Sequence, residues 1–406
     1  LSSTNKMFRL LQGDVGSGKT IVSLLAAINT INSGFQVAFM APTEILAKQH
    51  FKLAKKIFPK KINIELISGK SEYRVKKNIL EKLENNQINI IFGTHAIFQK
   101  KVNFKKLGLI IIDEQHKFGV NQRKKLSDKG GVDCDVLLMT ATPIPRTLTM
   151  TIYGDMDISI IREKPKNRKP IKTYSKLEAK IEDVLKFIKK EIQLNNQIFW
   201  VCPLIEESRK LDHTSAVNKF EYLEKRFPNQ VCLLHGKTQL EEKNTILNNF
   251  LQNKFKILVS TTIIEVGIDF PNANVIVIEN SNKFGLSQLH QLRGRVGRGN
   301  KDSTCILMFK SNLSDNAKKR IKILKDTNDG FLISEEDMKL RGFGDILGFK
   351  QSGIKNFKLA DPVQNADLFL LAEKEIRRIE NSGEDIQKFK PLIKLYDRAD
   401  IINDIA

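Results

Sequence analysis

The first residues that could do chemistry form a glycine-rich segment near the start of the chain, Gly13-Asp14-Val15-Gly16-Ser17-Gly18-Lys19-Thr20. It has the spacing G-x-x-x-x-G-K-T, follows a leucine pair and runs into the helical pattern Ile21–Ile28. Such glycines let successive backbone N–H groups curl around phosphate oxygens at a helix N-terminus. We expect Lys19 to reach the β- and γ-phosphates and the Thr20 hydroxyl to bind Mg²⁺. The segment predicts a site for ATP and Mg²⁺.

Two adjacent acids, Asp113 and Glu114, follow the apolar run Leu109–Ile112. Taken alone, an apolar run that ends in two acids is often a strand end with solvated carboxylates. In a chain that also carries a phosphate loop, we expect Asp113 to join Thr20 at Mg²⁺. Glu114 would then orient and deprotonate the attacking water.

A third segment, Gln291-Leu292-Arg293-Gly294-Arg295-Val296-Gly297-Arg298, contains three arginines separated by glycines. In isolation it could be a solvated basic turn. Opposite a nucleotide site, arginines neutralise charge on the phosphoryl group that is transferred. We therefore predict that Arg295 and Arg298 complete the catalytic set with Lys19, Asp113 and Glu114.

The elements that must position these residues are short apolar strands alternating with amphipathic helices. Continuous apolar runs of this kind are typical of strands buried on both faces. The alternation predicts α/β architecture with doubly wound, mainly parallel sheets. The expected strands are Val37–Met40, Ile88–Phe92, Leu109–Ile112, Val136–Met139, Gln197–Cys202, Val231–Leu234, Ile257–Ser260 and Val275–Glu279, and Thr43–Phe58 is an expected helix.

The chain is expected to divide into two lobes and a helical tail. A polar, proline-bearing stretch at residues 162–170 interrupts the alternation and reads as a linker. We predict a first lobe at 1–161 and a second at 171–310. No apolar strand pattern follows, so a helical hairpin and loop are expected at 311–356 and a helical segment at 357–406.

Composition limits the classes of partner. The chain has 406 residues, enough for two or three domains, and a formal net charge of +21. This charge suits polyanions, although an evenly solvated basic surface would give the same total. No apolar run is long enough to span a bilayer, so no membrane partner is expected. The four isolated cysteines form neither a metal-binding pair nor a dense disulfide framework, which favours a reducing cytoplasm.

Seven sequence blocks, taken in order, resemble the motif series of the superfamily 2 helicases. The blocks are Gly13–Thr20, Ala41–Glu44, Gly93–His95, Asp113–His116, Thr140–Thr142, Val259–Asp269 and Gln291–Arg298. The resemblance implies two tandem RecA-like lobes with ATP between them. It also adds Gly267, Asp269 and Gln291 to the nucleotide-binding residues of the glycine-rich segment.

Within that superfamily the chain most closely resembles the RecG family of bacterial DNA helicases, over nearly its whole length. The blocks that carry this resemblance are Asp113–Val120, Thr142–Leu148, Cys202–Ser208 and Asp329–Phe331. It implies an ATP-dependent helicase and translocase on duplex and branched DNA, at stalled forks and Holliday junctions, in repair and recombination. It further implies sequence-independent binding, a monomer, contact with a single-strand-binding protein, and a cytoplasmic, nucleoid-associated location.

Two alternatives stay open at the level of sequence. One is a nucleotide-gated DNA-binding module without productive hydrolysis. The other is a translocase similar to the Mfd transcription-repair coupling factors, which resemble this chain in both lobes and around Arg341–Gly353. Nothing in the chain resembles a helix that reads base edges.

The segment Arg341–Gly353 resembles the translocation motif that the RecG and Mfd families share. The resemblance implies a helical hairpin and loop that couple lobe closure to DNA movement. Three glycines make the loop adaptable, and Arg341 and Gln351 could reach phosphates or the hairpin. The family usually has proline where Phe343 stands. A helix-capping loop packed on the lobes is the plainer interpretation.

Further residues are expected at the DNA and at the coupling between DNA and ATP. Pro42, Thr43, Gly93 and Thr94 fall in blocks that hold the DNA backbone in these motors. The nearby Lys48, Lys52, Lys55 and Lys56 could add charge or simply be a solvated helix face. The resemblance implies that His116, Thr140 and Thr142 relay between the two sites.

The chain starts at Leu1 rather than at methionine. In the family an adenine-contacting segment and a wedge domain that splits the fork lie upstream of the phosphate loop. We expect both to fall before Leu1, so the chain would be the motor portion of a longer protein.

Overall fold

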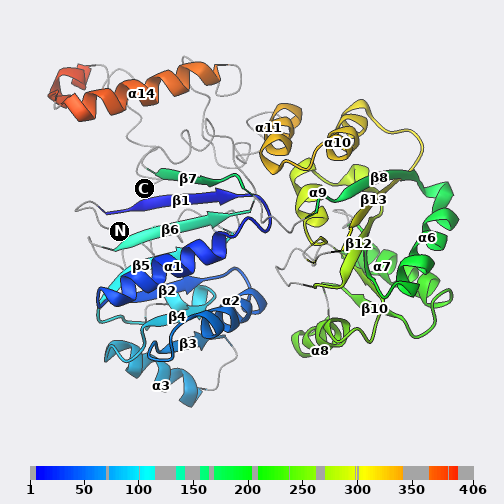
Figure 1. Cartoon of the computed structure of the whole chain (residues 1–406), viewed down its shortest axis with the longest axis horizontal. Coiled ribbons are helices and arrows are strands. Elements are labelled where there is room, and N and C mark those ends of the chain that lie inside the picture. Colours follow the sequence, from blue (N-terminus) through cyan, green and yellow to red (C-terminus); the bar gives the residue numbers. More distant parts are fainter. Residues whose placement is uncertain are drawn as a thin grey trace.

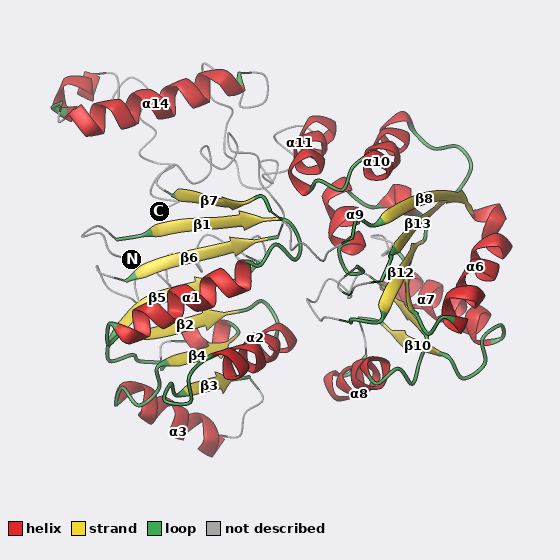
Figure 2. Cartoon of the chain, viewed as in Figure 1, coloured by secondary structure: helices red, strands yellow, loops and turns green. Residues whose placement is uncertain are grey.

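The chain forms two lobes, each built on a parallel sheet, with helices following the second (Figures 1 and 2). A computed structural model describes residues 6–69, 73–99, 101–114, 134–141, 156–163, 169–203, 209–236, 238–261, 270–297, 299, 301–341, 365–382 and 384–391. The strands of the first lobe end on the side that faces the second lobe (Figure 1).

The first lobe holds a seven-stranded sheet of order β3-β4-β2-β5-β6-β1-β7, in which all neighbouring strands are parallel. Its strands are β1 (Phe8–Gly13), β2 (Gln36–Met40), β3 (Ile64–Ile67), β4 (Ile90–Gly93), β5 (Leu107–Ile112), β6 (Asp135–Thr140) and β7 (Asp157–Ile161). Its helices are α1 (Lys19–Asn32), α2 (Glu44–Ile57), α3 (Tyr73–Glu84) and the short 3₁₀ helix η1 (His95–Phe98).

Helices cover both faces of this sheet because successive strand residues point to opposite sides. Leu11 and Val37 pack with Leu24 of α1 on one face. Their neighbours Leu10 and Ala38 belong to a separate cluster on the other face, together with residues of α3. This two-sided burial explains why the strand sequences are continuously apolar rather than alternating.

The second lobe repeats the plan with a six-stranded parallel sheet of order β10-β11-β9-β12-β13-β8. Its strands are β8 (Lys172–Leu177), β9 (Gln197–Val201), β10 (Val231–Leu234), β11 (Ile257–Ser260), β12 (Ala273–Ile278) and β13 (Thr304–Phe309). Its helices are α6 (Ile181–Gln193), α7 (Arg209–Glu224), α8 (Leu240–Leu251), α9 (Leu286–Arg293), η3 (Glu178–Lys180) and η5 (Ser281–Lys283). The core again has two faces, with Phe199 on one and Trp200 on the other.

Beyond β13 the described part of the chain is helical. Its elements are α10 (Asp315–Asp326), α11 (Gly330–Arg341), α14 (Ala366–Ser382) and η6 (Ile386–Phe389). Ile321 and Leu324 of α10 and Ile333 of α11 join the core of the second lobe, so these two helices pack on that lobe.

The prediction of α/β architecture with two tandem RecA-like lobes and a helical C-terminal region is confirmed. Every named strand is present, with ends within two residues of those expected. Two strands of the second lobe were not predicted, β8 and β13. The strand β8, Lys172–Leu177, lies at the edge of the sheet and pairs with one neighbour only. Its sequence is therefore more polar than that of a buried strand, and the apolar pattern did not reveal it. The domain boundaries stay a prediction: β7 ends at Ile161 and β8 starts at Lys172.

All four cysteines are buried and free. Burial raises the pKa of Cys134 and of Cys305 to about 12, so neither is a ready thiolate. Among the described helices, none is long and apolar enough to cross a membrane.

A buried glutamine fixes the start of β2, an interior strand of the first lobe. The Gln36 amide donates to the carbonyl oxygens of Leu83 and Ile88, at 2.9 Å each. Its Oε1 accepts from the N–H groups of Lys105 and Lys106 at 2.9 and 3.1 Å. In the second lobe Gln197 at the start of β9 likewise donates to Phe250 and Phe255, at 2.7 and 2.8 Å.

We predict that Gln36→Ala lowers the free energy of unfolding by about 3 kcal/mol or more, because the Ile88 carbonyl and the Lys105 and Lys106 N–H groups lose this partner, and each buried peptide group left unpaired costs about 1–3 kcal/mol. Urea unfolding followed by circular dichroism measures the change. Gln193→Ala, at the exposed end of α6, is the matched control and should stay within about 0.5 kcal/mol of the wild type. Equal stability of the two variants would refute a structural role for Gln36.

Candidate nucleotide site

The loops that carry the predicted site residues of the first lobe follow the carboxyl ends of neighbouring strands. Along this edge the order of the strands is β4, β2, β5, β6, β1. Gly93 and Thr94 therefore come first, then Pro42 and Thr43, then Asp113 and Glu114, then Thr140, and finally the loop 13–20. The residues predicted to bind DNA and those predicted to bind nucleotide lie at opposite ends of one edge, with the two acids between them.

The loop between β1 and α1 has the geometry of a phosphate cradle. Gly16 and Gly18 have φ values of 74° and 94°, in the left-handed region that glycine adopts without strain. Lys19 is buried, and its ammonium donates to the carbonyl oxygens of Gly13 at 2.8 Å and Asp14 at 3.0 Å. The positive charge is thus held inside the curve of the loop.

The unsatisfied groups of this loop fit a phosphate. The hydroxyl of Ser17 is buried and has no hydrogen-bond partner among the described residues. No side chain caps the N-terminus of α1, and its first turn has no acid. An anion at this helix end would satisfy N–H donors and meet the positive end of the helix dipole. Thr20 is half-buried at the same helix end.

Asp113 lies directly after β5, where its carboxylate is paired with a histidine of α2. His50 Nε2 lies 2.8 Å from Asp113 Oδ2, and both residues are buried. Burial alone would raise the pKa of Asp113. The hydrogen bond and charge of His50, the charge of Lys19 and the Glu114 N–H outweigh burial and hold that pKa below its ordinary value of 3.8. The carboxylate is therefore kept ionised, as a ligand for Mg²⁺ must be.

Glu114 has a strained backbone. Its φ is 54°, whereas every other described residue with positive φ is asparagine or glycine. Its N–H donates to Asp113 Oδ1 at 3.0 Å, which helps to hold the turn. Non-glycine residues in the left-handed region are concentrated at functional sites. The strain is consistent with a turn that presents the Glu114 side chain in a fixed direction.

The second lobe contacts the phosphate loop through α9 and the turn after it. His290 Nε2 lies 2.7 Å from Asp14 Oδ1, and both side chains are buried. A methyl group at position 294 would lie 3.0 Å from Cβ of Val15, so the Gly294 backbone touches the loop. Arg295, the next residue in the sequence, is buried. Gln291 is half-buried on α9.

Arg293 forms hydrogen bonds that hold two helices of the second lobe together. Its guanidinium donates to the carbonyl oxygens of Leu324 and Thr327, at 2.6 and 2.9 Å, and it is 1% exposed. It thereby ties α9 to the C-terminal end of α10, within the second lobe. The choice of Arg295 and Arg298 as the catalytic arginines stays a prediction.

Several residues expected at the DNA have local structural roles. The Thr43 hydroxyl accepts from the Leu46 N–H at 3.4 Å and so caps α2. A methyl group at position 93 would lie 2.6 Å from the Ile67 carbonyl oxygen, so β4 can pack there only as glycine. Thr140 is buried at the end of β6, paired in register with Gln12 of β1. Their roles at DNA stay predictions.

Other predicted residues lie outside the described residues: His116, Thr142, Gly267, Asp269, Arg298 and Gln351. Arg341 is the last residue of α11. The middle of the predicted linker, 164–168, and the predicted loop from residue 342 onward also lie outside the described part.

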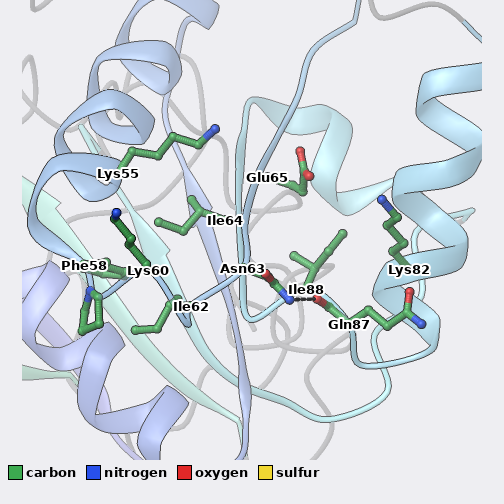
Figure 3. Close-up of a pocket in the computed structure, with 11 residues that line it drawn as sticks. Lys55, Phe58, Lys60, Ile62, Asn63, Ile64, Glu65, Lys82, Gln87 and Ile88 are labelled. Carbon is green, nitrogen blue, oxygen red and sulfur yellow. Dashed lines mark hydrogen bonds between the residues drawn. The ribbon is translucent and has the colours of Figure 1, made fainter.

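A cavity of about 700 Å³ lies at the opposite, amino-terminal edge of the first sheet (Figure 3). It is lined by Lys55, Lys60 and Lys82, and Asn63 there donates to the Gln87 carbonyl oxygen at 2.9 Å. None of the predicted site residues lines it. Because Lys55 is at this edge, the end of α2 is better explained as a solvated basic helix end than as a DNA contact.

Sequence reasoning missed His50 and His290. A signal for His50 was available: it lies on the buried face of α2 with Leu46, Ala47 and Ala54, where a polar side chain needs a partner. His290 gave no such signal, because its partner is 276 positions away in the sequence.

Three family descriptions match successive parts of the chain. DEAD/DEAH box helicase matches residues 3–151, and helicase conserved C-terminal domain matches residues 179–300. The third, ATP-dependent DNA helicase RecG, domain 3, C-terminal, matches residues 327–397.

Curated relatives carry the name ATP-dependent DNA helicase RecG. The chain is 49% identical to the protein of Bacillus subtilis over 90% of its own length and 54% of the relative. It is 45% identical to that of Thermotoga maritima over 97% of its length and 50% of the relative. The chain thus spans about half the length of the curated relatives it matches.

Solved structures agree with this relationship. The structure of RecG bound to a three-way DNA junction superposes with a TM-score of 0.74 at 43% identity, covering 90% of this chain and 48% of that one. Saccharomyces cerevisiae Dbp5 bound to RNA and ADP BeF3 gives a TM-score of 0.59 at 20% identity, covering 82% of this chain and 90% of that one, and shows the fold alone.

We predict that His50→Phe destabilises the chain by about 2–3 kcal/mol near neutral pH, because it removes a hydrogen bond to a buried charge. Phenylalanine keeps the ring that packs on Phe39. The pKa of Asp113 is lowered in the folded chain, so the pair of His50 and Asp113 stabilises the folded chain at pH values above the ordinary carboxyl pKa. This stabilisation is lost as pH falls through the lowered pKa.

Urea unfolding at neutral pH and at about pH 3 measures this dependence. The control is Ile57→Phe, at an exposed position of the same helix α2, which removes no titratable group and should not change the pH dependence. The prediction would be contradicted if the difference in the free energy of unfolding between wild type and His50→Phe stayed constant or grew at the acidic pH.

Proposed function

The chain belongs to the RecG family of superfamily 2 helicases, and from that premise we propose that it is an ATP-hydrolysing motor on duplex and branched DNA. The observation that carries the proposal is the contact between the phosphate loop of one lobe and α9 of the other, with Asp113 on the strand edge beside them. ATP hydrolysis would then depend on lobe closure, which is how turnover becomes motion on DNA.

Each residue of the nucleotide site has a role that follows from its chemistry. Lys19 neutralises the β- and γ-phosphates, and the N–H groups of the loop hold their oxygens. Thr20 and the ionised Asp113 would hold Mg²⁺, which supplies positive charge to the phosphate oxygens. Glu114 takes the proton of the attacking water. Arg295 and Arg298 bring positive charge from the second lobe to the phosphoryl group.

Gly267, Asp269 and Gln291 complete the nucleotide contacts of the second lobe. Pro42, Thr43, Gly93 and Thr94 lie at the end of the edge away from the phosphate loop, where they would contact the DNA backbone. Contacts to the backbone carry no sequence information directly. Thr140 ends the strand between the one that precedes the two acids and the one that precedes the phosphate loop, and with His116 and Thr142 it would relay between the nucleotide site and the DNA. Arg341 and Gln351 belong to the translocation segment.

The action on branched DNA is supported by the relatives named ATP-dependent DNA helicase RecG and by the related RecG structure bound to a three-way junction. A role at stalled forks and Holliday junctions in repair and recombination follows from the family. An Mfd-like translocase is not favoured, because the C-terminal part matches the RecG description. A monomer, contact with single-strand-binding protein, and a cytoplasmic, nucleoid-associated location stay predictions of the resemblance.

We predict that Lys19→Ala lowers the rate of ATP hydrolysis by about 100-fold or more, since a charge aimed at the transferred phosphoryl group is lost. A phosphate-release assay measures the rate, and thermal unfolding checks that the variant folds. Lys189→Ala, on the exposed face of α6, is the matched control and should keep the wild-type rate. Undiminished hydrolysis by Lys19→Ala, or by Arg298→Ala, would refute the assigned site.

We predict that duplex and forked DNA stimulate ATP hydrolysis and that the stimulation fades as salt rises, because phosphate contacts release counterions. The assay compares no DNA, single strands, duplex and a three-way junction across a salt series. Lys19→Ala, assayed with the same DNAs, gives the background rate of ATP hydrolysis that is subtracted. If ATP binds but no DNA raises turnover, the nucleotide-gated binding module is the better description.

A further inference from the structure

The carboxylate of Asp113 accepts two hydrogen bonds that come from different parts of the first lobe. Its Oδ1 accepts from the Glu114 N–H at 3.0 Å, and its Oδ2 lies 2.8 Å from Nε2 of His50. The Glu114 N–H belongs to the adjoining residue and moves with Asp113 itself. His50 belongs to α2, so its bond fixes the direction of the carboxylate relative to a separate helix.

His50 is the donor in this bond. An ionised carboxylate can only accept hydrogen bonds, and it offers about four lone-pair sites. Because the carboxylate of Asp113 is kept ionised, the proton of the bond lies on Nε2 of His50. The two donors leave lone pairs on the carboxylate, and carboxylate oxygens are the ligands that Mg²⁺ takes from proteins.

The imidazole ring itself is held in place. His50 is 5% exposed, and its ring lies 4.8 Å from the ring of Phe39 in β2, at an interplanar angle of 41°. Strand β2 also holds the backbone of Asp113, whose N–H donates to the Met40 carbonyl oxygen at 2.9 Å. Strand β2 and the helix after it therefore fix both the backbone and the side chain of Asp113.

A role in stability alone gives a weak reason for this pair. The cost of removing two charges from water largely offsets their attraction, so a buried charged pair as a whole adds little to stability. Gln36 shows the contrast, because it bonds backbone groups at the amino end of β2. The bond of His50 ends instead on a carboxylate at the carboxyl edge of the sheet, where the loop 13–20 also lies.

We propose that His50 is a positioning residue for Mg²⁺, which acts by holding the Asp113 carboxylate in the direction that a bound metal–nucleotide complex requires. This inference rests on the proposed binding of ATP and Mg²⁺, and it adds to that site a residue of α2. Removing a group that orients a metal ligand typically costs about 10- to 100-fold in metal affinity. His50 should therefore matter for the metal and not for the nucleotide alone.

The test is the affinity of the full chain for a fluorescent, non-hydrolysable ATP analogue, measured once with Mg²⁺ and once with a chelator. The ratio of the two Kd values gives the contribution of the metal to binding. In the wild type, Mg²⁺ should tighten binding of the analogue. In His50→Phe that gain should fall about ten-fold or be lost altogether, while the Kd measured with the chelator stays at the wild-type value.

Two further variants at the same position test the hydrogen bond itself. His50→Gln is the conservative variant, because the amide nitrogen of glutamine is as many bonds from Cα as Nε2 of histidine and can donate. It should keep most of the gain from Mg²⁺. His50→Asn carries the same amide one bond closer to the backbone, so it should lose the gain, and it replaces His50→Phe if that variant does not fold.

Gln36→Ala is the matched control, because it removes buried hydrogen bonds from the same lobe at the opposite edge of the sheet. It should keep the wild-type gain from Mg²⁺ although it is destabilised. Thermal unfolding checks that each variant is folded at the temperature of the assay.

The outcomes separate the inference from the proposed function. The inference is overturned if His50→Phe keeps the wild-type gain, if His50→Gln loses as much as His50→Phe, or if Gln36→Ala loses as much. A wild type that binds the analogue equally with and without Mg²⁺ also overturns it and leaves nucleotide binding intact. A wild type that binds the analogue under neither condition overturns the proposed function, and the inference fails with it.

Discussion

Parallel pairing of the strands in the first sheet is the constraint on which the site depends. Because every described strand of that sheet runs the same way, the loops after β4, β2, β5, β6 and β1 open onto one edge. This brings Lys19 close enough to Asp113 for its charge to lower the pKa of that carboxyl. The same arrangement places the buried Asp113 beside α2, the helix that follows the neighbouring strand, and its carboxylate is paired there with His50.

The sequence was sufficient for the fold and for the local motifs. Apolar strands buried on both faces look alike wherever they occur, and the loop 13–20 carries its own geometry in its glycines. The polar strand β8 could not be recognised, since an edge strand needs little apolar surface. A glutamine such as Gln36 gives no sequence signal either, because its four partners are backbone groups from three other segments.

The part of the site that sequence could not supply is made of pairs between distant elements. His50 and Asp113 are 63 positions apart, and Asp14 and His290 are 276 apart. A sequence motif specifies residue types at a given spacing along the chain. The pair of His50 and Asp113 depends instead on how a helix packs on the sheet, and the pair of Asp14 and His290 depends on the contact between the two lobes. Gly330 belongs to the same class, because a methyl group there would lie 2.8 Å from both Asp14 Oδ1 and His290 Nε2.

The chemistry of the interlobe contact suits a joint that must open repeatedly. A large apolar interface would be held shut by the hydrophobic effect, which grows with the area buried. The contact of Asp14 with His290 is polar instead, and water can replace its hydrogen bond when the lobes part, so the net free energy of that bond is small. Buried polar pairs of this kind contribute more to register than to stability. The contact is therefore specified geometrically while remaining reversible, which is the property that the proposed motor would need at the boundary between its phosphate loop and its second lobe.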